Sequence, residues 1–312
     1  MVHFLPCVLI AAAPLLLCAR ALILKVKYMN KKAEFKKLFL QTAPYHHNYK
    51  VFDDFISCFA ISLHNAMNKD QELEDRYLSI IANYEKDDVF NFSKLGALLV
   101  GAYQEEGFCD LLGEVYMELE ISSKELGQFF TPYCVSKLMA ELTLDKNALQ
   151  NKDYITLSEP ACGSGGMLIA YAEVMQNAGL NPQKQLLVTC VDIDQTAAMM
   201  CYIQLTLLGI PAEVIIGNTL TMQFSRTMKT FMYHMDGWDI KRLLPTKQLS
   251  PLIPLINESK ESIKHSSNLS KNEVEEELLQ RIKNGDSIIK TEINPFITRL
   301  SINDDIYDLL IA

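Results

Sequence analysis

The sequence predicts an α/β domain that follows a helical N-terminal region. Three patterns indicate this fold. A β-branched and aromatic run at 154–157 ends in a glycine-rich turn, which opens a helix at about 167–177. Two further apolar runs, at 186–191 and 214–216, each end in polar residues. From 30 to 125, apolar residues instead recur at three- and four-residue steps, as Phe52, Phe55, Ile56 and Phe59 do, which is typical of amphipathic helices.

The glycine-rich turn at 159–166 reads Glu-Pro-Ala-Cys-Gly-Ser-Gly-Gly. Gly163, Gly165 and Gly166 permit positive φ and let the backbone approach a ligand closely. A nicotinamide site would bind a pyrophosphate at this helix start with the spacing G-x-G-x-x-G. The spacing here differs, and Glu159 would repel a phosphate. The turn therefore favours a cofactor with a cationic end and no phosphate, and S-adenosylmethionine carries a sulfonium and an ammonium.

This turn resembles the S-adenosylmethionine loop of the adenine-specific (N6) DNA methyltransferases, and it is most similar to that of type I restriction-modification methylase subunits. The segment 127–132, Gly-Gln-Phe-Phe-Thr-Pro, is similar to the motif that precedes the sheet in that family. The resemblance covers about residues 126–222 and implies a Rossmann-like methyltransferase domain. It also implies that Thr131 and Pro132 cover the methionine part of the cofactor and that Ala161 lies with the glycines in the cofactor loop.

Two polar strand ends follow in the family order. The first is Val-Asp-Ile-Asp at 191–194, where the carboxylate of Asp192 can accept hydrogen bonds from both ribose hydroxyls. The second is Gly-Asn-Thr-Leu at 217–220, where Asn218 can donate to and accept from an adenine edge, although the family more often has an acidic residue there. Simpler alternatives remain open: a plain tight turn at the glycines, and Asp192 as the N-cap of a helix at 195–208.

One family motif is missing. Amino-methylating enzymes of this family carry Asn/Asp/Ser-Pro-Pro-aromatic after a fourth strand, where it orients the flipped base and its amine. None of the eleven prolines of this chain adjoins another. The nearest imitation, Asn294-Pro295-Phe296, lacks the second proline and follows a charged stretch. No residue is therefore assigned to catalysis. No fourth strand is evident after Asn218, so a truncated sheet is left open.

Composition argues against a strongly DNA-binding surface. The 312 residues have a net charge of −9, and 70–125 contains fourteen acidic and four basic residues. DNA binding draws on lysine and arginine. The only notable basic cluster, Lys31, Lys32, Lys36 and Lys37, fits a solvated helix face as well as it fits DNA. In type I systems, as the resemblance implies, a helical region precedes the catalytic domain and a separate specificity subunit reads the bases.

Cysteine and tryptophan positions predict no further site. The eight cysteines include no C-x-x-C pair and no histidine at ligand spacing, so neither a metal site nor a disulfide framework is expected. Cys162 is interpreted as a small residue in a tight turn. The only tryptophan, Trp238, lies in a stretch with a turn signal, Met-Asp-Gly-Trp-Asp at 235–239, which predicts a loop. An exposed anchor for a partner is a weaker option for Trp238.

The chain is expected to divide into four parts. Residues 1–28 hold an apolar stretch, broken by two prolines and Arg20, for which a signal peptide, a membrane anchor and sequence upstream of a misplaced start codon all compete. We favour the misplaced start, with Met29 as the natural beginning, and a membrane association is not expected. A helical domain at 29–125 and a methyltransferase-like domain at 126–247 follow. The last part, 248–312, reads as a polar linker and a C-terminal helical tail.

The functional prediction has two forms. By resemblance, the chain is a cytoplasmic, S-adenosylmethionine-dependent, adenine-specific DNA methyltransferase of a restriction-modification system or mobile element. Its partners would be DNA and a specificity or second methylase subunit. Alternatively, because the amine-activating motif is missing, the chain is a catalytically impaired regulatory or assembly subunit that still binds the cofactor. Methylation of RNA, protein or a small molecule by the same fold is a third, weaker option.

Overall fold

The computed structural model describes residues 31–119, 130–145, 147, 149 and 152–242. Several predictions lie outside these residues: those for the apolar segment 1–28, for the first part of the Gly-Gln-Phe-Phe-Thr-Pro motif, and for the linker and helical tail after 247. The Asn294-Pro295-Phe296 segment lies outside them too. The chain divides into two compact units between Trp238 and Asp239, and the description below concerns the first.

Helices make up the described N-terminal region, as the sequence predicts. They are α3 (Lys31–Gln41), α4 (Asn48–Asn68), α5 (Gln71–Ile81), α6 (Lys86–Glu106) and α7 (Leu111–Glu118). Phe52, Phe55, Ile56 and Phe59 of α4 are all buried, and the rings of Phe55 and Phe92 meet edge to face with centroids 5.8 Å apart. Burial of aromatic side chains on one helix face is the main stabilising contribution in this region.

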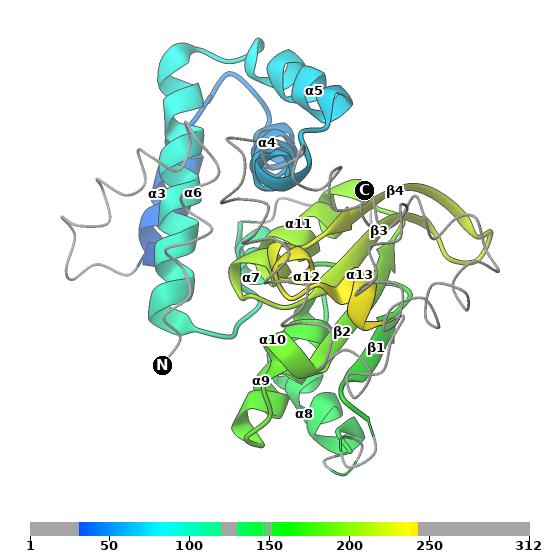
Figure 1. Cartoon of the computed structure of the whole chain (residues 1–312). Helices are drawn as coiled ribbons and strands as arrows, with labels where there is room; N and C mark the ends of the chain where they lie inside the picture. Colours follow the sequence, from blue (N-terminus) through cyan, green and yellow to red (C-terminus); the bar gives the residue numbers. More distant parts are fainter. Residues whose placement is uncertain (1–30, 120–129, 146, 148, 150–151, 243–312) are drawn as a thin grey trace, which may run out of the picture. The chain divides into compact units, whose positions relative to one another are not determined.

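A four-stranded sheet forms the rest of the unit, and Figure 1 shows its strands side by side. The strands are β1 (Ile155–Glu159), β2 (Leu186–Asp192), β3 (Ala212–Asn218) and β4 (Gln223–Lys229), in the order β1-β2-β3-β4. The first three are parallel, because α9 (Gly166–Asn177) and α11 (Gln195–Leu207) return the chain between them. The predicted α/β fold with an N-terminal helical region is confirmed.

Two short helices complete the pattern around the sheet. Helix α8 (Tyr133–Thr143) precedes β1 and packs against α9, and α10 (Pro182–Gln185) leads directly into β2. Helix α11 is buried along almost its whole length, because it packs against β3 on one side and against α4 on the other. Helix α11 therefore joins the helical region to the sheet.

No fourth strand is evident in the sequence after Asn218, but the structure has one, β4, which pairs antiparallel with β3. The strand is polar, and of its seven residues only Met228 is buried. An apolar pattern is therefore absent, and backbone pairing with β3 specifies the strand. The pairing of β3 with β4 shifts register between Ile216 and Gly217. The β4 backbone lies close to Gly217 there, because a Cβ on Gly217 would be 2.5 Å from the Gln223 carbonyl oxygen.

The predicted loop with an exposed tryptophan is also wrong. Trp238 is fully buried and packs with Leu187 and Tyr233, and its ring meets Tyr154 edge-on with centroids 4.9 Å apart. It begins the short helix α13 (Trp238–Lys241), after α12 (Phe231–Met235) and a turn at Gly237 with φ +64°. The turn at Gly237 agrees with the turn signal in the sequence. A local pattern cannot indicate that Trp238 is buried against the sheet.

Polar contacts also connect the helical region to the sheet. The Arg226 guanidinium on β4 lies 2.7 Å from Asp70 and 2.8 Å from Glu72, at the start of α5. The Thr196 hydroxyl on α11 donates to Asp53 on α4. Among the described residues, no helix combines the length and the apolar composition that a membrane span requires.

Candidate cofactor site

The carboxyl ends of β1, β2 and β3 meet at one edge of the sheet, which brings Glu159, Asp192 and Asn218 to the same side. Parallel pairing has this effect because all three strands run in one direction. Backbone contacts fix the turns between them. The Cys162 amide donates to the Val191 carbonyl at 2.9 Å, and the Thr219 hydroxyl donates to the Pro160 carbonyl at 2.7 Å. The sequence placed these three side chains at strand ends, and the topology places them together.

The glycine turn has the backbone that its sequence predicts. Gly163 and Gly165 adopt φ of +54° and +95°, a region that side chains other than glycine rarely enter. Gly165 is the N-cap of α9, and Gly166 is its first residue. A Cβ on Gly163 would lie 3.0 Å from the Phe130 ring, and one on Gly165 would lie 2.9 Å from the Cys201 sulfur. Space and backbone conformation both exclude larger residues here.

Asp192 holds this turn in place. One carboxylate oxygen accepts from the Gly163 amide at 2.7 Å, and the other accepts from the Asp194 amide at 2.9 Å. Each oxygen keeps a second lone pair, so the carboxylate retains capacity for two further donors. Burial raises the pKa of Asp192, against the effect of these amides. The helix N-cap is Asp194 instead, whose side chain accepts from the Thr196 amide at 2.8 Å, so the alternative role considered for Asp192 is wrong.

Asn218 has fewer hydrogen-bonding groups left for a ligand than its side chain carries. Its oxygen accepts from the backbone amides of Leu220 and Thr221, at 2.9 and 3.2 Å. Both lone pairs of the oxygen are therefore engaged in the turn after β3. Only the side-chain NH₂ group remains for an adenine edge, which corrects the expectation that Asn218 both donates and accepts.

The Thr131-Pro132 pair lies beside the glycine turn. Both residues are exposed, and the preceding Phe130 ring packs over Gly163 and against Tyr116, with ring centroids 5.3 Å apart. Pro132 then starts α8 and accepts from the Val135 amide at 2.9 Å. The two motifs that the sequence identified separately are therefore neighbours in the structure.

A cavity of about 280 Å³ lies between α8, β1 and α9. Its lining is mostly apolar, and Glu159 extends into it from the end of β1, beside the glycine turn. The lining residues are Met139, Ala140, Thr143, Leu157, Glu159, Met167, Leu168 and Tyr171. The cavity therefore connects one candidate cofactor residue to an apolar space.

A buried polar network behind the glycine turn escaped the sequence analysis. Asp110, the N-cap of α7, accepts from the Ser164 hydroxyl at 2.7 Å, from the Gln204 amide at 2.8 Å and from the Gly113 backbone at 3.1 Å. Gln204 also donates to the Ser164 carbonyl at 2.6 Å and accepts from Tyr103 on α6. Burial raises the pKa of Asp110. The spacing of these residues in the chain, across 101 positions from Tyr103 to Gln204, carries no local signal.

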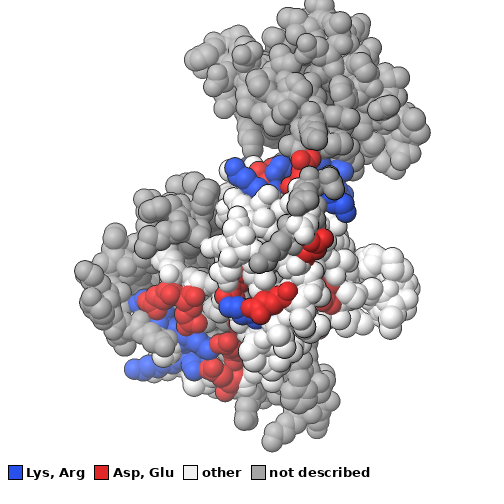
Figure 2. All heavy atoms as spheres, turned by 90° about the horizontal axis from the view of Figure 1, so that it is seen from below, with Lys and Arg blue, Asp and Glu red and all other residues white. Residues whose placement is uncertain are grey.

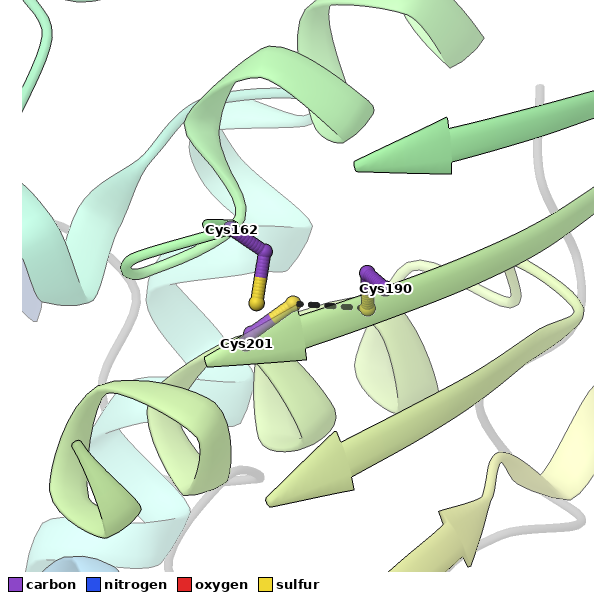
Figure 3. Close-up of side chains that lie close together, drawn as sticks. All are labelled: Cys162, Cys190 and Cys201. Atoms are coloured by element: carbon purple, nitrogen blue, oxygen red, sulfur yellow. Dashed lines mark hydrogen bonds between the residues drawn. The ribbon is translucent and has the colours of Figure 1, made fainter. Parts of the chain in front are cut away.

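Three cysteines also converge here without a sequence signal. Cys162 comes from the glycine turn, Cys190 from β2 and Cys201 from α11, and Figure 3 shows the three side chains close together in the interior. Hydrogen bonds from the thiols of Cys190 and Cys201 lower the pKa of Cys162, whereas the pKa values of the other two thiols are raised. The spacing of these cysteines in the sequence, which includes no C-x-x-C pair, does not indicate this convergence.

Most lysines of the basic cluster on α3 form ion pairs with glutamates. Lys32 pairs with Glu114 and Glu118, and Lys36 lies 2.6 Å from Glu118. Lys31 lies 3.5 Å from Glu34 within α3. On the face drawn in Figure 2, basic and acidic side chains lie beside one another. These ion pairs favour the solvated helix face over a DNA contact as the role of the cluster.

Comparison with known proteins gives the family. The model of the family described as N-6 DNA Methylase matches residues 109–236, from just before α7 to just after α12. Residues 109–236 are therefore similar to the N-6 DNA methylase family. The match confirms the resemblance that the glycine turn and the two strand ends predicted. This methylase region, 109–236, also includes Asp110, so the network behind the turn lies within it.

Two curated relatives come from Methanocaldococcus jannaschii. The chain is 23% identical over 147 residues to the type I restriction enzyme MjaIX methylase subunit, which covers 44% of this chain and 25% of that protein. It is 30% identical over 174 residues to the MjaVIII methylase subunit, covering 50% and 28%. The chain thus spans about a quarter of the length of these relatives.

Two solved structures resemble this chain more distantly. One is a putative class I S-adenosylmethionine-dependent methyltransferase from Listeria monocytogenes, with a TM-score of 0.34, 11% identity and coverage of 66% of this chain and 69% of that chain. The other is a type I restriction-modification methyltransferase subunit from Streptococcus thermophilus, with a TM-score of 0.29, 15% identity and coverage of 65% and 56%.

Proposed function

We propose that this chain binds S-adenosylmethionine at the carboxyl edge of β1, β2 and β3 and methylates the N6 amine of adenine in DNA. The setting would be a restriction-modification system or mobile element. One observation carries the proposal: Glu159, Asp192 and Asn218 converge on a glycine turn within a region of the N-6 DNA methylase family. When bound, S-adenosylmethionine supplies an electrophilic methyl group on its sulfonium.

The donor set fits this cofactor. Asp192 has capacity for two hydroxyl donors of a ribose, Glu159 offers a negative charge to a cationic end, and the Asn218 NH₂ group can donate to an adenine nitrogen. Gly163, Gly165, Gly166 and Ala161 let the ligand approach the backbone closely, and Thr131 and Pro132 would cover its methionine part. A phosphate-bearing cofactor fits less well beside two carboxylates.

DNA and a second polypeptide are the proposed partners. The net charge of −9 and the ion-paired lysines of α3 supply little of the positive field that DNA binding draws on. Both curated relatives are named methylase subunits, which supports assembly with another chain. A specificity or second methylase subunit would then supply most of the DNA contacts. The cytoplasm, where DNA lies, is the proposed location.

A second candidate is a cofactor-binding subunit without turnover. The chain has no adjacent prolines, so the side chain and carbonyl that would hold the adenine amine have no evident counterpart. This protein would use cofactor binding to regulate or assemble a methylase complex.

The two candidates separate in one pair of measurements. Calorimetry with S-adenosylmethionine tests the site, and transfer of a radioactive methyl group to DNA, with and without any specificity subunit encoded nearby, tests catalysis. Binding with transfer supports the methyltransferase, and binding without transfer supports the second candidate, provided that an active family member labels the same DNA. Absence of binding rules out both.

A further inference from the structure

The three converging cysteines have a geometry that the proposed cofactor site does not require. The sulfur atoms of Cys162, Cys190 and Cys201 all lie within 4.8 Å of one another, and those of Cys190 and Cys201 are 3.8 Å apart (Figure 3). A packed core needs no such convergence, since isolated buried thiols behave as small apolar groups. Cys58 on α4 is a buried cysteine of that ordinary kind.

The spacing of the sulfurs matches that of a metal–thiolate centre. Zinc binds thiolate sulfur at about 2.3 Å, so two sulfurs at a tetrahedral angle lie about 3.8 Å apart. A disulfide would require a sulfur separation of about 2 Å and would join only two of the three residues. The arrangement therefore suits a shared central ion better than a covalent pair.

The three positions are also held rigidly and apart from solvent. Cys190 lies in a strand paired on both sides, Cys201 lies in the buried helix α11, and the Cys162 amide is bonded to the Val191 carbonyl. The exposed fraction of Cys162 is 6%, and Cys190 and Cys201 are fully buried. The missing side chain of Gly165 leaves room for the Cys201 sulfur. Ligands fixed in this way lose little conformational entropy when an ion binds.

We propose that Cys162, Cys190 and Cys201 bind one thiophilic divalent ion of the Zn²⁺ class. Thiolate ligands select such soft or borderline ions. Charge favours a divalent ion, because three buried thiolates with Zn²⁺ leave one net negative charge, whereas a monovalent ion would leave two. Binding releases the thiol protons to solvent.

An ion bound by the three cysteines would hold the glycine turn in place. The ion would tie Cys162 in the turn to β2 and α11, alongside the hydrogen bond between Asp192 and Gly163. The inference concerns metal binding and stands independently of methyl transfer. Its test therefore uses metal binding as the readout.

The experiment compares the reduced full-length protein with serine variants. Metal analysis and titration of the metal-free protein against a zinc chelator should show one Zn²⁺ per chain. Co²⁺ should substitute with a sulfur-to-metal charge-transfer band. Each of Cys162→Ser, Cys190→Ser and Cys201→Ser should weaken Zn²⁺ binding at least about tenfold. Tenfold is the lower end of the loss in metal affinity when only a residue that supports a metal ligand is mutated. Cys58→Ser, a buried cysteine on α4, and Cys134→Ser, an exposed one, should bind as the unmodified chain does.

Clear results would overturn the inference. One is a reduced, folded chain that takes up no stoichiometric Zn²⁺. Another is Zn²⁺ binding by all three cluster variants that equals binding by the unmodified chain. The last is a Co²⁺ complex without the charge-transfer band. The Co²⁺ spectrum of the unmodified chain keeps the test decisive even if a serine variant fails to fold. Cofactor calorimetry on the same protein separates this result from the proposed function, because S-adenosylmethionine binding without Zn²⁺ uptake contradicts only the metal site.

Discussion

The Asp110 carboxylate accepts a hydrogen bond from the Ser164 hydroxyl at 2.7 Å, which joins the first turn of α7 to the glycine turn after β1. The two residues are 54 positions apart, and both are buried. A Cβ on Gly166 would lie 2.8 Å from the same carboxylate oxygen, so the turn fits closely around Asp110. The helical region thus supports the candidate cofactor site from behind.

Removal of the Ser164 hydroxyl should destabilise the fold. Ser164→Ala leaves one oxygen of a buried carboxylate without its donor, which costs about 1–3 kcal/mol in the free energy of unfolding. Denaturant titration measures this difference. Ser158→Ala, an exposed serine on β1, is the matched control and should change the free energy by less than about 0.5 kcal/mol. Equal effects of the two changes would show that the bond between Asp110 and Ser164 contributes nothing.

The neighbouring aspartates at the end of β2 should differ in cofactor binding. Asp192→Asn loses a charged acceptor at the glycine turn, so S-adenosylmethionine should bind at least about tenfold more weakly by calorimetry. Asp194→Asn is the control, because asparagine caps a helix as well as aspartate does. Its affinity should stay within about twofold of the unmodified chain. Equal loss in both variants would contradict the role proposed for Asp192.

The contact between Asp70 and Arg226 should make stability depend on pH. The Leu73 amide and the Arg226 guanidinium lower the pKa of Asp70 below its ordinary value of 3.8. The stabilising contribution is therefore fully present above pH 3.8 and disappears as the pH falls through the lower pKa of the folded state.

The variant Asp70→Asn keeps an oxygen for the helix cap and removes only the charge. We expect it to be less stable than the unmodified chain at pH 7, by at most about 1 kcal/mol because the pair is partly exposed. Thermal unfolding between pH 7 and 3 should show the difference shrinking as the pH falls. A difference that is constant with pH would assign the effect to the cap.

The burial of Trp238 gives a large expected effect. Trp238→Ala would open a cavity beside Leu187, Tyr233 and Tyr154 and should lower the free energy of unfolding by about 3–5 kcal/mol. Met235→Ala, an exposed apolar residue three positions earlier, should cost less than about 0.5 kcal/mol. If Trp238→Ala were as mild and instead abolished assembly with a partner chain, the exposed anchor that the sequence suggested would be correct after all.

Local patterns account for most of the elements. The runs at 186–191 and 214–216 lie within β2 and β3, and the run at 154–157 overlaps β1 from Ile155. The predicted helices at 167–177 and 195–208 agree with α9 and α11 to within a residue. Strand β4 was missed because its side chains are polar and exposed, and its specification comes from pairing with β3. Trp238 was misplaced because a turn signal reports backbone conformation and carries no information about burial.

By itself, the sequence determined the glycine turn, its order relative to the two polar strand ends, and hence the similarity to the N-6 DNA methylase family. These features are local, because positive φ, strand alternation and helix capping depend on a few adjacent residues. Only the tertiary structure decided that Asp194 rather than Asp192 caps α11, that Asp110 supports the turn, and that three distant cysteines converge. Asp192 is engaged by the Gly163 amide, 29 positions away, and the contacts of Asp110 and of the cysteines also join different elements of the chain, which the packing of the helices and the sheet brings together.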